Sequence, residues 1–201
     1  MTSYEDILVK VSYETLDFDH VRWPVEEIYD YISEGQKEYA RVTGCLVANS
    51  IVVGNADGVY SVPDDFIRPL EFRNIDDKLI KQYSLAELDQ LYGAKWLTNK
   101  GEIPEGVCFD YGTYGTFNLI PFIPAEKIAG TLSYVRLPSE DYVEVDDDIA
   151  ILNYVLCRLY EAEKDKRFIK KFLTCGNEFN KRLAYKAKKT ANRAYPKGRY
   201  Y

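Results

Sequence analysis

The amino-acid sequence predicts an α+β fold, in which a helical bundle built from N- and C-terminal helices carries a small inserted β-rich domain. Three observations lead to this prediction. Apolar residues recur at helical spacing before residue 44, they do so again after residue 145, and the segment between reads as short extended stretches broken by Gly and Pro turns. The flanking helices need one another to bury their apolar stripes, so we expect them to pack together.

The N-terminal part, residues 1–44, is predicted to form two helices of the bundle. In the first, YEDILVKVSYETL, Ser3 and Asp6 form a possible capping box, and apolar side chains recur at roughly helical spacing at Ile7, Leu8, Val11 and Leu16. The second spans residues 23–44. Pro24 fits its first turn, because the N–H that proline lacks would be unpaired there in any case.

Residues 45–137 are predicted to form the inserted β-rich domain. CLVANSIVV and GVYSVP read as strands separated by the turn GNADG, and TFNLIPFIP and TLSYVRL read as two further extended segments. Residues 84–92 form a short helix, with a capping box made by Ser84 and Glu87. Residues 101–127 are expected to supply a strand and its turns, with rim loops available for contact.

Two other interpretations of residues 101–127 fit less well. A proline-rich ligand needs an exposed polyproline helix, whereas Pro121 and Pro124 stand among large apolar side chains. A phosphate-binding loop would need a Gly-Lys-Ser/Thr ending inside a strand-loop-helix unit, and the sequence GTYG lacks that ending.

The C-terminal part, residues 138–189, is predicted to add two helices to the bundle, followed by a basic, tyrosine-rich tail at 190–201. Three aspartates, from Asp146 to Asp148, precede the first of these helices. Calcium loops space their ligands at alternate positions and carry a Gly and a distal Glu, so an N-cap with acids on the first helical turn is the simpler interpretation. Gly176 is expected to weaken the last helix near its middle.

Charge is unevenly distributed along the chain. The segment from Lys164 to Tyr201 holds 13 Lys and Arg against two acids, whereas the other 163 residues hold 13 bases and 30 acids. Basic side chains interleaved with tyrosines suit phosphate neutralisation with base stacking, docking on an acidic protein groove, or a solvated helix face. Because the acidic body would repel a duplex at close range, docking on a protein is the favoured interpretation.

The sequence gives little support for catalysis, a metal site or a membrane span. Its only histidine, His20, stands in an apparent loop without a nucleophile motif. Four cysteines are not spaced like zinc ligands and are expected to be buried thiols in a reducing compartment: Cys45, Cys108, Cys157 and Cys175. Neither a membrane span nor a signal peptide is predicted, and we expect no cofactor. An enzyme of unknown type stays open as an alternative, recognisable by a pocket with converging titratable groups.

Several short motifs follow one another between residues 4 and about 190. They are a helix with DILVKV, Trp23 before EEIYDYISEGQKEYARVTG, YSVPDDF, the helix SLAELDQ, Trp96 before GEIP, the strands LIPFIP and LSYVR, and a helix pair opened by aspartates. This order resembles the head-to-tail connector (adaptor) proteins of tailed bacteriophages, which form the ring between portal and tail. Pro24, where the family pattern often has a capping Ser or Thr, and the tyrosine-rich basic end depart from the pattern.

The resemblance implies a structural virion protein that is not an enzyme. It implies a homo-oligomeric ring, expected to be a dodecamer, with the helical bundle beside its neighbours and genomic DNA passing through the lumen. The portal and a downstream tail protein would be its partners, in the neck of the phage particle after assembly in the host cytoplasm. A nucleic-acid-binding protein that uses the basic C-terminal helix and tail stays open as the alternative.

Two sets of residues are candidate contact sites. Positive charge interleaved with tyrosine predicts portal docking by Lys186, Lys188, Lys189, Arg193, Tyr195, Lys197, Arg199, Tyr200 and Tyr201. The tail-facing loops of the β-rich domain are predicted to present Asn55, Asp57, Tyr111 and Tyr114.

Overall fold

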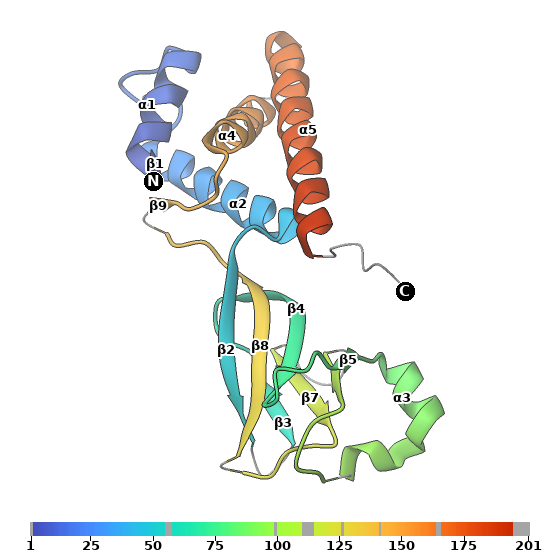
Figure 1. Cartoon of the computed structure of the whole chain (residues 1–201). Coiled ribbons are helices and arrows are strands. Elements are labelled where there is room, and N and C mark those ends of the chain that lie inside the picture. Colours follow the sequence, from blue (N-terminus) through green and yellow to red (C-terminus); the bar gives the residue numbers. More distant parts are fainter. Residues whose placement is uncertain are drawn as a thin grey trace. The chain divides into compact units, whose positions relative to one another are not determined.

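The computed structural model describes residues 2–54, 58–98, 100–109, 115–125, 127–140, 142–163 and 166–194. The chain divides into two compact units (Figure 1). The first, which we call the helical unit, contains residues 1–46 and 137–201, and the second, which we call the sheet unit, contains residues 47–136.

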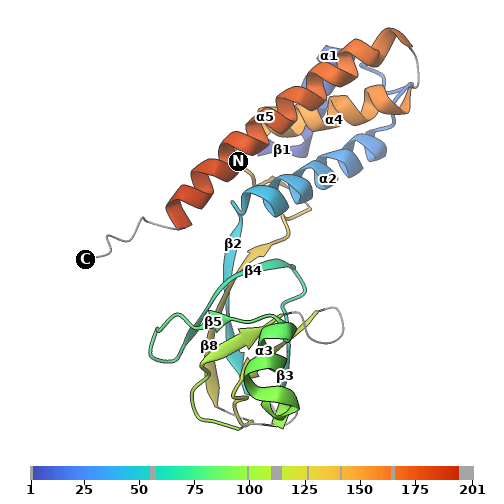
Figure 2. The ribbon, with the colours of Figure 1, turned by 90° about the vertical axis from the view of Figure 1, so that its right-hand side faces the viewer.

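Four α-helices form most of the described helical unit: α1 (Tyr4–Thr15), α2 (Val25–Thr43), α4 (Asp148–Ala162) and α5 (Ile169–Ala194). A short 3-10 helix, η2 (Lys166–Phe168), precedes α5. Two strands of two residues each, β1 (Thr2–Ser3) and β9 (Tyr142–Val143), pair antiparallel beside the helices. Figure 1 shows α4 between α1 and α5, and α4 packs against both of them and against α2, beside which it also lies in Figure 2.

Local caps set the ends of the first two helices. The Ser3 backbone N–H donates to the Asp6 carboxylate at 2.8 Å, and the Asp6 N–H donates back to the Ser3 hydroxyl at 3.1 Å, which completes the predicted capping box. Gly44 ends α2 at a φ of 64°, a left-handed conformation that glycine adopts without strain. Pro24 is the N-cap residue of α2 and so lies just before the first turn in which we predicted it.

The core of the helical unit is apolar, and the buried polar side chain of Gln36 is hydrogen-bonded within it. Ile7, Ile32 and Leu159, from three different helices, are fully buried together. The buried Gln36 donates from its side-chain amide to the Tyr4 hydroxyl at 3.0 Å. Its carbonyl oxygen accepts from the Glu144 N–H at 2.8 Å, so the segment entering α4 is hydrogen-bonded to α2.

The sheet unit contains two sheets. One is antiparallel with the strand order β2-β8-β4, formed by β2 (Val47–Val53), β8 (Ile128–Arg136) and β4 (Phe66–Asn74). The other has the order β3-β7-β6-β5, formed by β3 (Val59–Ser61), β7 (Thr116–Ile120), β6 (Gly106–Cys108) and β5 (Lys81–Gln82). Only the β5–β6 pair within it is parallel.

This unit buries its own core between the two sheets. Phe72 and Leu132 of the first sheet cluster with Phe117 and Leu119 of the second. A second cluster forms where α3 (Leu85–Tyr92) and the 3-10 helix η1 (Gly93–Thr98) cover β6 and β7 with Leu88, Trp96, Cys108 and Ile120. The predicted capping box of Ser84 and Glu87 begins α3.

The predicted fold class, a helical bundle with a small β-rich insertion, is wrong. The described residues form five α-helices and nine strands in three sheets, which is a mixed α/β fold. The sheet unit carries a helix of its own and buries two apolar clusters, and the helical unit contains the β1–β9 pair. Strands of two residues are too short to show alternation in a sequence, and local periodicity does not reveal how much core a segment can build.

Candidate functional site

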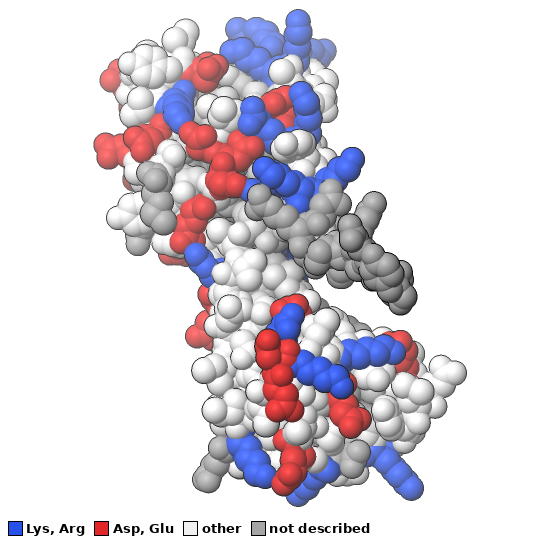
Figure 3. All heavy atoms as spheres, viewed as in Figure 1, with Lys and Arg blue, Asp and Glu red and all other residues white. Residues whose placement is uncertain are grey.

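Basic side chains gather over α5 in the helical unit (Figure 3). α5 also extends beyond the predicted end of its helix at residue 189, because no Gly or Pro interrupts TANRA and helical hydrogen bonding continues to Ala194. The helix carries basic residues in its first turn and again from Lys181 to its end, and it forms the candidate contact surface of this unit.

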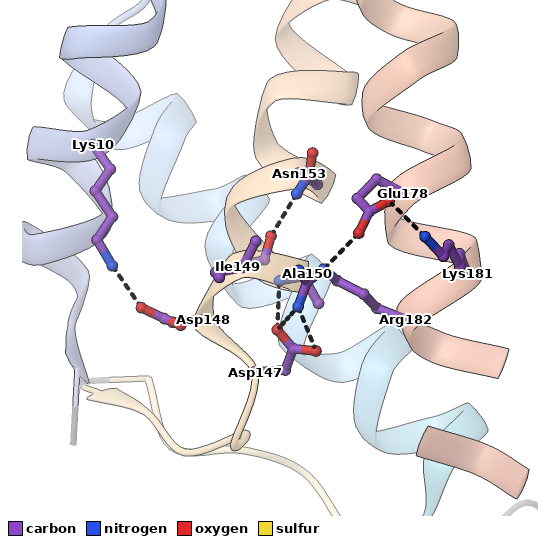
Figure 4. Close-up of polar contacts among 9 residues, drawn as sticks. All are labelled: Lys10, Asp147, Asp148, Ile149, Ala150, Asn153, Glu178, Lys181 and Arg182. Carbon is purple, nitrogen blue, oxygen red and sulfur yellow. Dashed lines mark hydrogen bonds and ion pairs between the residues drawn. The ribbon is translucent and has the colours of Figure 1, made fainter. Parts of the chain in front are cut away.

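The N-terminus of α4 holds this basic helix in place (Figure 4). The Asp147 side chain accepts from the Ala150 N–H at 3.0 Å, which is the N-cap predicted from the sequence. The same carboxylate accepts from Nη1 of Arg182 in α5 at 3.0 and 3.3 Å, while Nε of Arg182 donates to Glu178 at 3.0 Å. The Asp147 carboxylate therefore caps α4 and at the same time pairs with a cation of α5.

The aspartates on either side make equivalent contacts to other helices. Lys10 of α1 donates to Asp148 at 2.5 Å, and Lys186 of α5 pairs with Asp146. The hydrogen bond from Lys10 lowers the pKa of the Asp148 carboxyl from its ordinary value. Three consecutive aspartates thus tie α1 and α5 to the start of α4, and among the described residues no group of three or more metal-ligating side chains gathers.

This geometry separates the predicted docking residues of α5 into two classes. Lys186 is turned to Asp146, with 18% of its side chain exposed. Lys188 and Lys189 are exposed and make no ion pair with another described residue. Arg193 lies in α5, but its side chain is outside the described part. Outside it altogether are Tyr195, Lys197, Arg199, Tyr200 and Tyr201.

The four residues predicted for the tail-facing loops, Asn55, Asp57, Tyr111 and Tyr114, also lie outside the described residues. Described residues that follow these loops show where each loop ends. Val59 pairs with Asn118 at one end of β3, next to the first loop. At the other end of β3 the Val62 N–H donates to the Gly115 carbonyl at 2.8 Å, next to the second loop. The first loop therefore leads into β3, whereas the second leads into β7, whose first residue, Thr116, pairs with Ser61 at the other end of β3.

Close helix packing positions α5 against α4. A Cβ atom on Gly176 would lie 3.2 Å from Sγ of Cys157, so the glycine that we expected to weaken α5 allows the two helices to approach. Phe179 packs edge-to-face on Tyr154 with ring centroids 5.1 Å apart. Burial raises the pKa of the Cys157 thiol to about 11 and also raises that of Cys175.

His20 offers no catalytic relay among the described residues. Its Nε2 lies 3.5 Å from the Ser12 hydroxyl, and its Nδ1 is buried without a hydrogen-bond partner. The nearby Asp17 carboxylate accepts instead from the backbone N–H groups of Val21, Arg22 and Trp23. A histidine that acts as a general base needs a group to orient it, and no side chain in the described part of the chain is hydrogen-bonded to Nδ1.

The sequence did not indicate the partners of the aspartates. Lys10 and Asp148 are separated by 138 positions and Arg182 and Asp147 by 35, and no local pattern links residues so far apart. Leu16 was predicted to belong to the apolar stripe of its helix, yet it is exposed as the C-cap residue of α1.

The comparisons with known proteins agree with the resemblance found in the sequence. No helix among the described residues is both long and apolar enough to cross a membrane. Curated proteins gave no match to the chain. A family model described as SU10 adaptor protein matches residues 2–199. Since that match covers nearly all of the sequence, the chain belongs to the SU10 adaptor protein family, as expected of a bacteriophage head-to-tail adaptor.

Proposed function

We propose that the protein is the subunit of a homo-oligomeric ring, expected to be a dodecamer, that joins the portal to the tail and lets DNA pass through its lumen. The observation that carries the proposal is the adaptor family match over residues 2–199. An adaptor associates with other structural proteins of the phage, so contact surfaces and not a catalytic centre are the functional features to look for.

The C-terminal end of α5 and the residues after it are the proposed portal-docking segment. Lys188 and Lys189 support this role because both are exposed and unpaired with other described residues. Six further residues of the set lie at the end of α5 or follow it in the sequence, with charge and aromatic rings that suit an acidic groove. We assign Lys186 to a supporting role, because its ion pair with Asp146 positions the helix that carries the segment.

The sheet unit is the proposed contact for the downstream tail protein. Asn55, Asp57, Tyr111 and Tyr114 remain the proposed residues. Because one loop leads into β3 at Val59 and the other leads into β7 beside the opposite end of β3, we propose two separate contacts on this unit.

The test is to mix the purified chain with the portal protein of the same phage and to examine the mixture by negative-stain electron microscopy beside the chain alone. A closed ring stacked on the portal is the expected result. The double variant Lys188→Glu/Lys189→Glu is expected to lose portal binding, whereas the matched reversal Lys78→Glu in the sheet unit is expected to keep it. Absence of any ring or complex at high protein concentration would contradict the proposal.

Nucleic-acid binding by α5 and the tail is the second candidate, because ten Lys and Arg stand between residues 166 and 194. Two of these, Arg182 and Lys186, are already paired with Asp147 and Asp146, which leaves fewer charges for phosphates. Binding of duplex DNA whose logarithmic affinity falls with the logarithm of salt by about 0.9 per neutralised phosphate would favour this candidate.

A further inference from the structure

α1 presents an apolar stripe to solvent on the side opposite its buried face. Val9, Tyr13 and Leu16 are 49%, 67% and 77% exposed, and they stand four and three residues apart, on one face of the helix. Phe18 and Val21 in the following loop are exposed as well. The rings of Tyr13 and Phe18 pack edge-to-face with centroids 5.3 Å apart, so the stripe and the loop form one surface.

This surface contributes nothing visible to the core of its own unit. The core contacts of α1 are made by Tyr4, Ile7 and Val11, on the other face of the helix. Exposed apolar side chains that gather on one surface of a soluble protein mark a contact with another molecule.

The α5 side of the helical unit also has exposed apolar residues, at the same end of the unit as the stripe of α1. α5 lies across α4 from α1 (Figure 1), and its Ile169 and Leu173 are each 53% exposed. Both sets lie at the same end of the unit, because the loop after α1 reaches the turn before α5. There Arg22 pairs with Glu163, and its guanidinium carbon lies 4.9 Å from the centroid of the Phe168 ring.

The two sides also carry opposite charge, as Figure 3 shows. Residues 4–22 contain five acids and two bases, and both bases, Lys10 and Arg22, pair with acids of α4 and its C-cap. Residues 166–194 contain ten bases and one acid. A neighbouring copy of this chain therefore brings a basic surface to the acidic one, and electrostatic complementarity of this kind favours one orientation over others.

From these observations we infer that the stripe of α1 in one copy packs antiparallel along the outer face of α5 in the next copy. In every copy α1 runs towards the end at which α5 begins, so side-by-side copies in the same orientation bring the two helices together antiparallel. With Leu16 beside Ile169, Tyr13 falls beside Leu173. At a rise of about 1.5 Å per residue, Glu5 lies about 16 Å from Leu16 along α1, and Lys181 lies about 18 Å from Ile169 along α5. The two charged side chains are then within reach of one another.

Different surfaces of the two copies meet in this contact, so it repeats from copy to copy and closes into a ring when the rotation permits. The inference rests on the proposed function, and it adds which helix faces meet in the ring.

The test uses two single variants, Leu16→Cys and Ile169→Cys. Each variant is assembled on the portal by itself, and an equimolar mixture of the two variants is assembled on the portal in parallel. A short bis-maleimide is added, and the wild-type chain measures the background from the native cysteines. The expected result is a cross-linked dimer in the mixture that is lost in each variant alone. A second measurement follows charge: Glu5→Lys is expected to reduce ring formation, and Lys181→Glu in the same chain is expected to restore it.

The outcomes separate this inference from the proposed function. A dimer formed by either variant alone means that like faces meet, which overturns the inference. Rings that form without any cross-link above background overturn it too, but leave the adaptor ring intact. If neither variant nor the wild-type chain forms rings with the portal, the proposed function and the inference both fail.

Discussion

Arg182 of α5 donates from one guanidinium nitrogen to both oxygens of the Asp147 carboxylate, at 3.0 and 3.3 Å. The same carboxylate caps α4, and Arg182 also donates to Glu178 one turn earlier in its own helix. The Asp147 side chain therefore fixes the start of α4 and the position of the basic helix α5 together. The proposed docking segment begins at the C-terminal end of α5.

The shared carboxylate predicts an unequal effect of two neighbouring substitutions. Asp147→Ala removes a helix cap and an ion pair and is expected to lower the free energy of unfolding by about 1–3 kcal/mol. Asp146→Ala removes only the pair with Lys186 and is expected to cost about 0.2–1 kcal/mol. Urea denaturation followed by circular dichroism measures both, and equal losses would show that the cap contributes nothing.

Gly35 of α2 is expected to resist the substitution that usually stabilises a helix. Gly→Ala in a helix interior normally gains about 1 kcal/mol. Here the added Cβ would lie 2.9 Å from the Tyr154 ring, so Gly35→Ala is expected to lose about 1–3 kcal/mol. Gly176→Ala is the comparison, with a smaller loss expected because its nearest atom is one sulfur at 3.2 Å. A more stable Gly35→Ala variant would contradict this packing.

The contact between Lys10 and Asp148 predicts a pH dependence. The pKa of Asp148 is lowered in the folded chain, so the contribution of the contact is present above the ordinary carboxyl value of 3.8 and is lost as pH falls through the folded value. Both side chains are partly exposed, so Lys10→Met is expected to cost about 0.2–1 kcal/mol at neutral pH. The difference from wild type should vanish in acid and shrink in high salt. A difference that persists below the folded pKa would rule out this origin.

The thiols packed between α4 and α5 are expected to react slowly. Burial raises the pKa of Cys157 from 9.0 to about 11, which lowers its thiolate fraction at neutral pH by roughly a hundredfold. Alkylation with iodoacetamide, followed by peptide mass spectrometry, should label Cys157 far more slowly in the native chain than in urea. Equal rates in the two conditions would show that the thiol is neither buried nor shifted.

Local sequence determined the ends of several elements and the family. Gly44 and the pair of Ser84 and Glu87 set helix ends through contacts within a few residues, and the resemblance over residues 4–190 anticipated the family match. Such features need only the residue types and their spacing, since caps and turns satisfy backbone groups close by.

Only the tertiary structure decided the proportions of the fold and the contacts of the site. Leu16 and Val9 are as apolar as Ile7, and which of them faces the core depends on where α4 packs. The partners of Asp147 and Asp148 come from helices distant in the chain, and their meeting depends on how the whole helical unit folds. Periodicity assigns residues to a helix face, but the packing of other elements decides which face is buried and which remains free to contact another molecule.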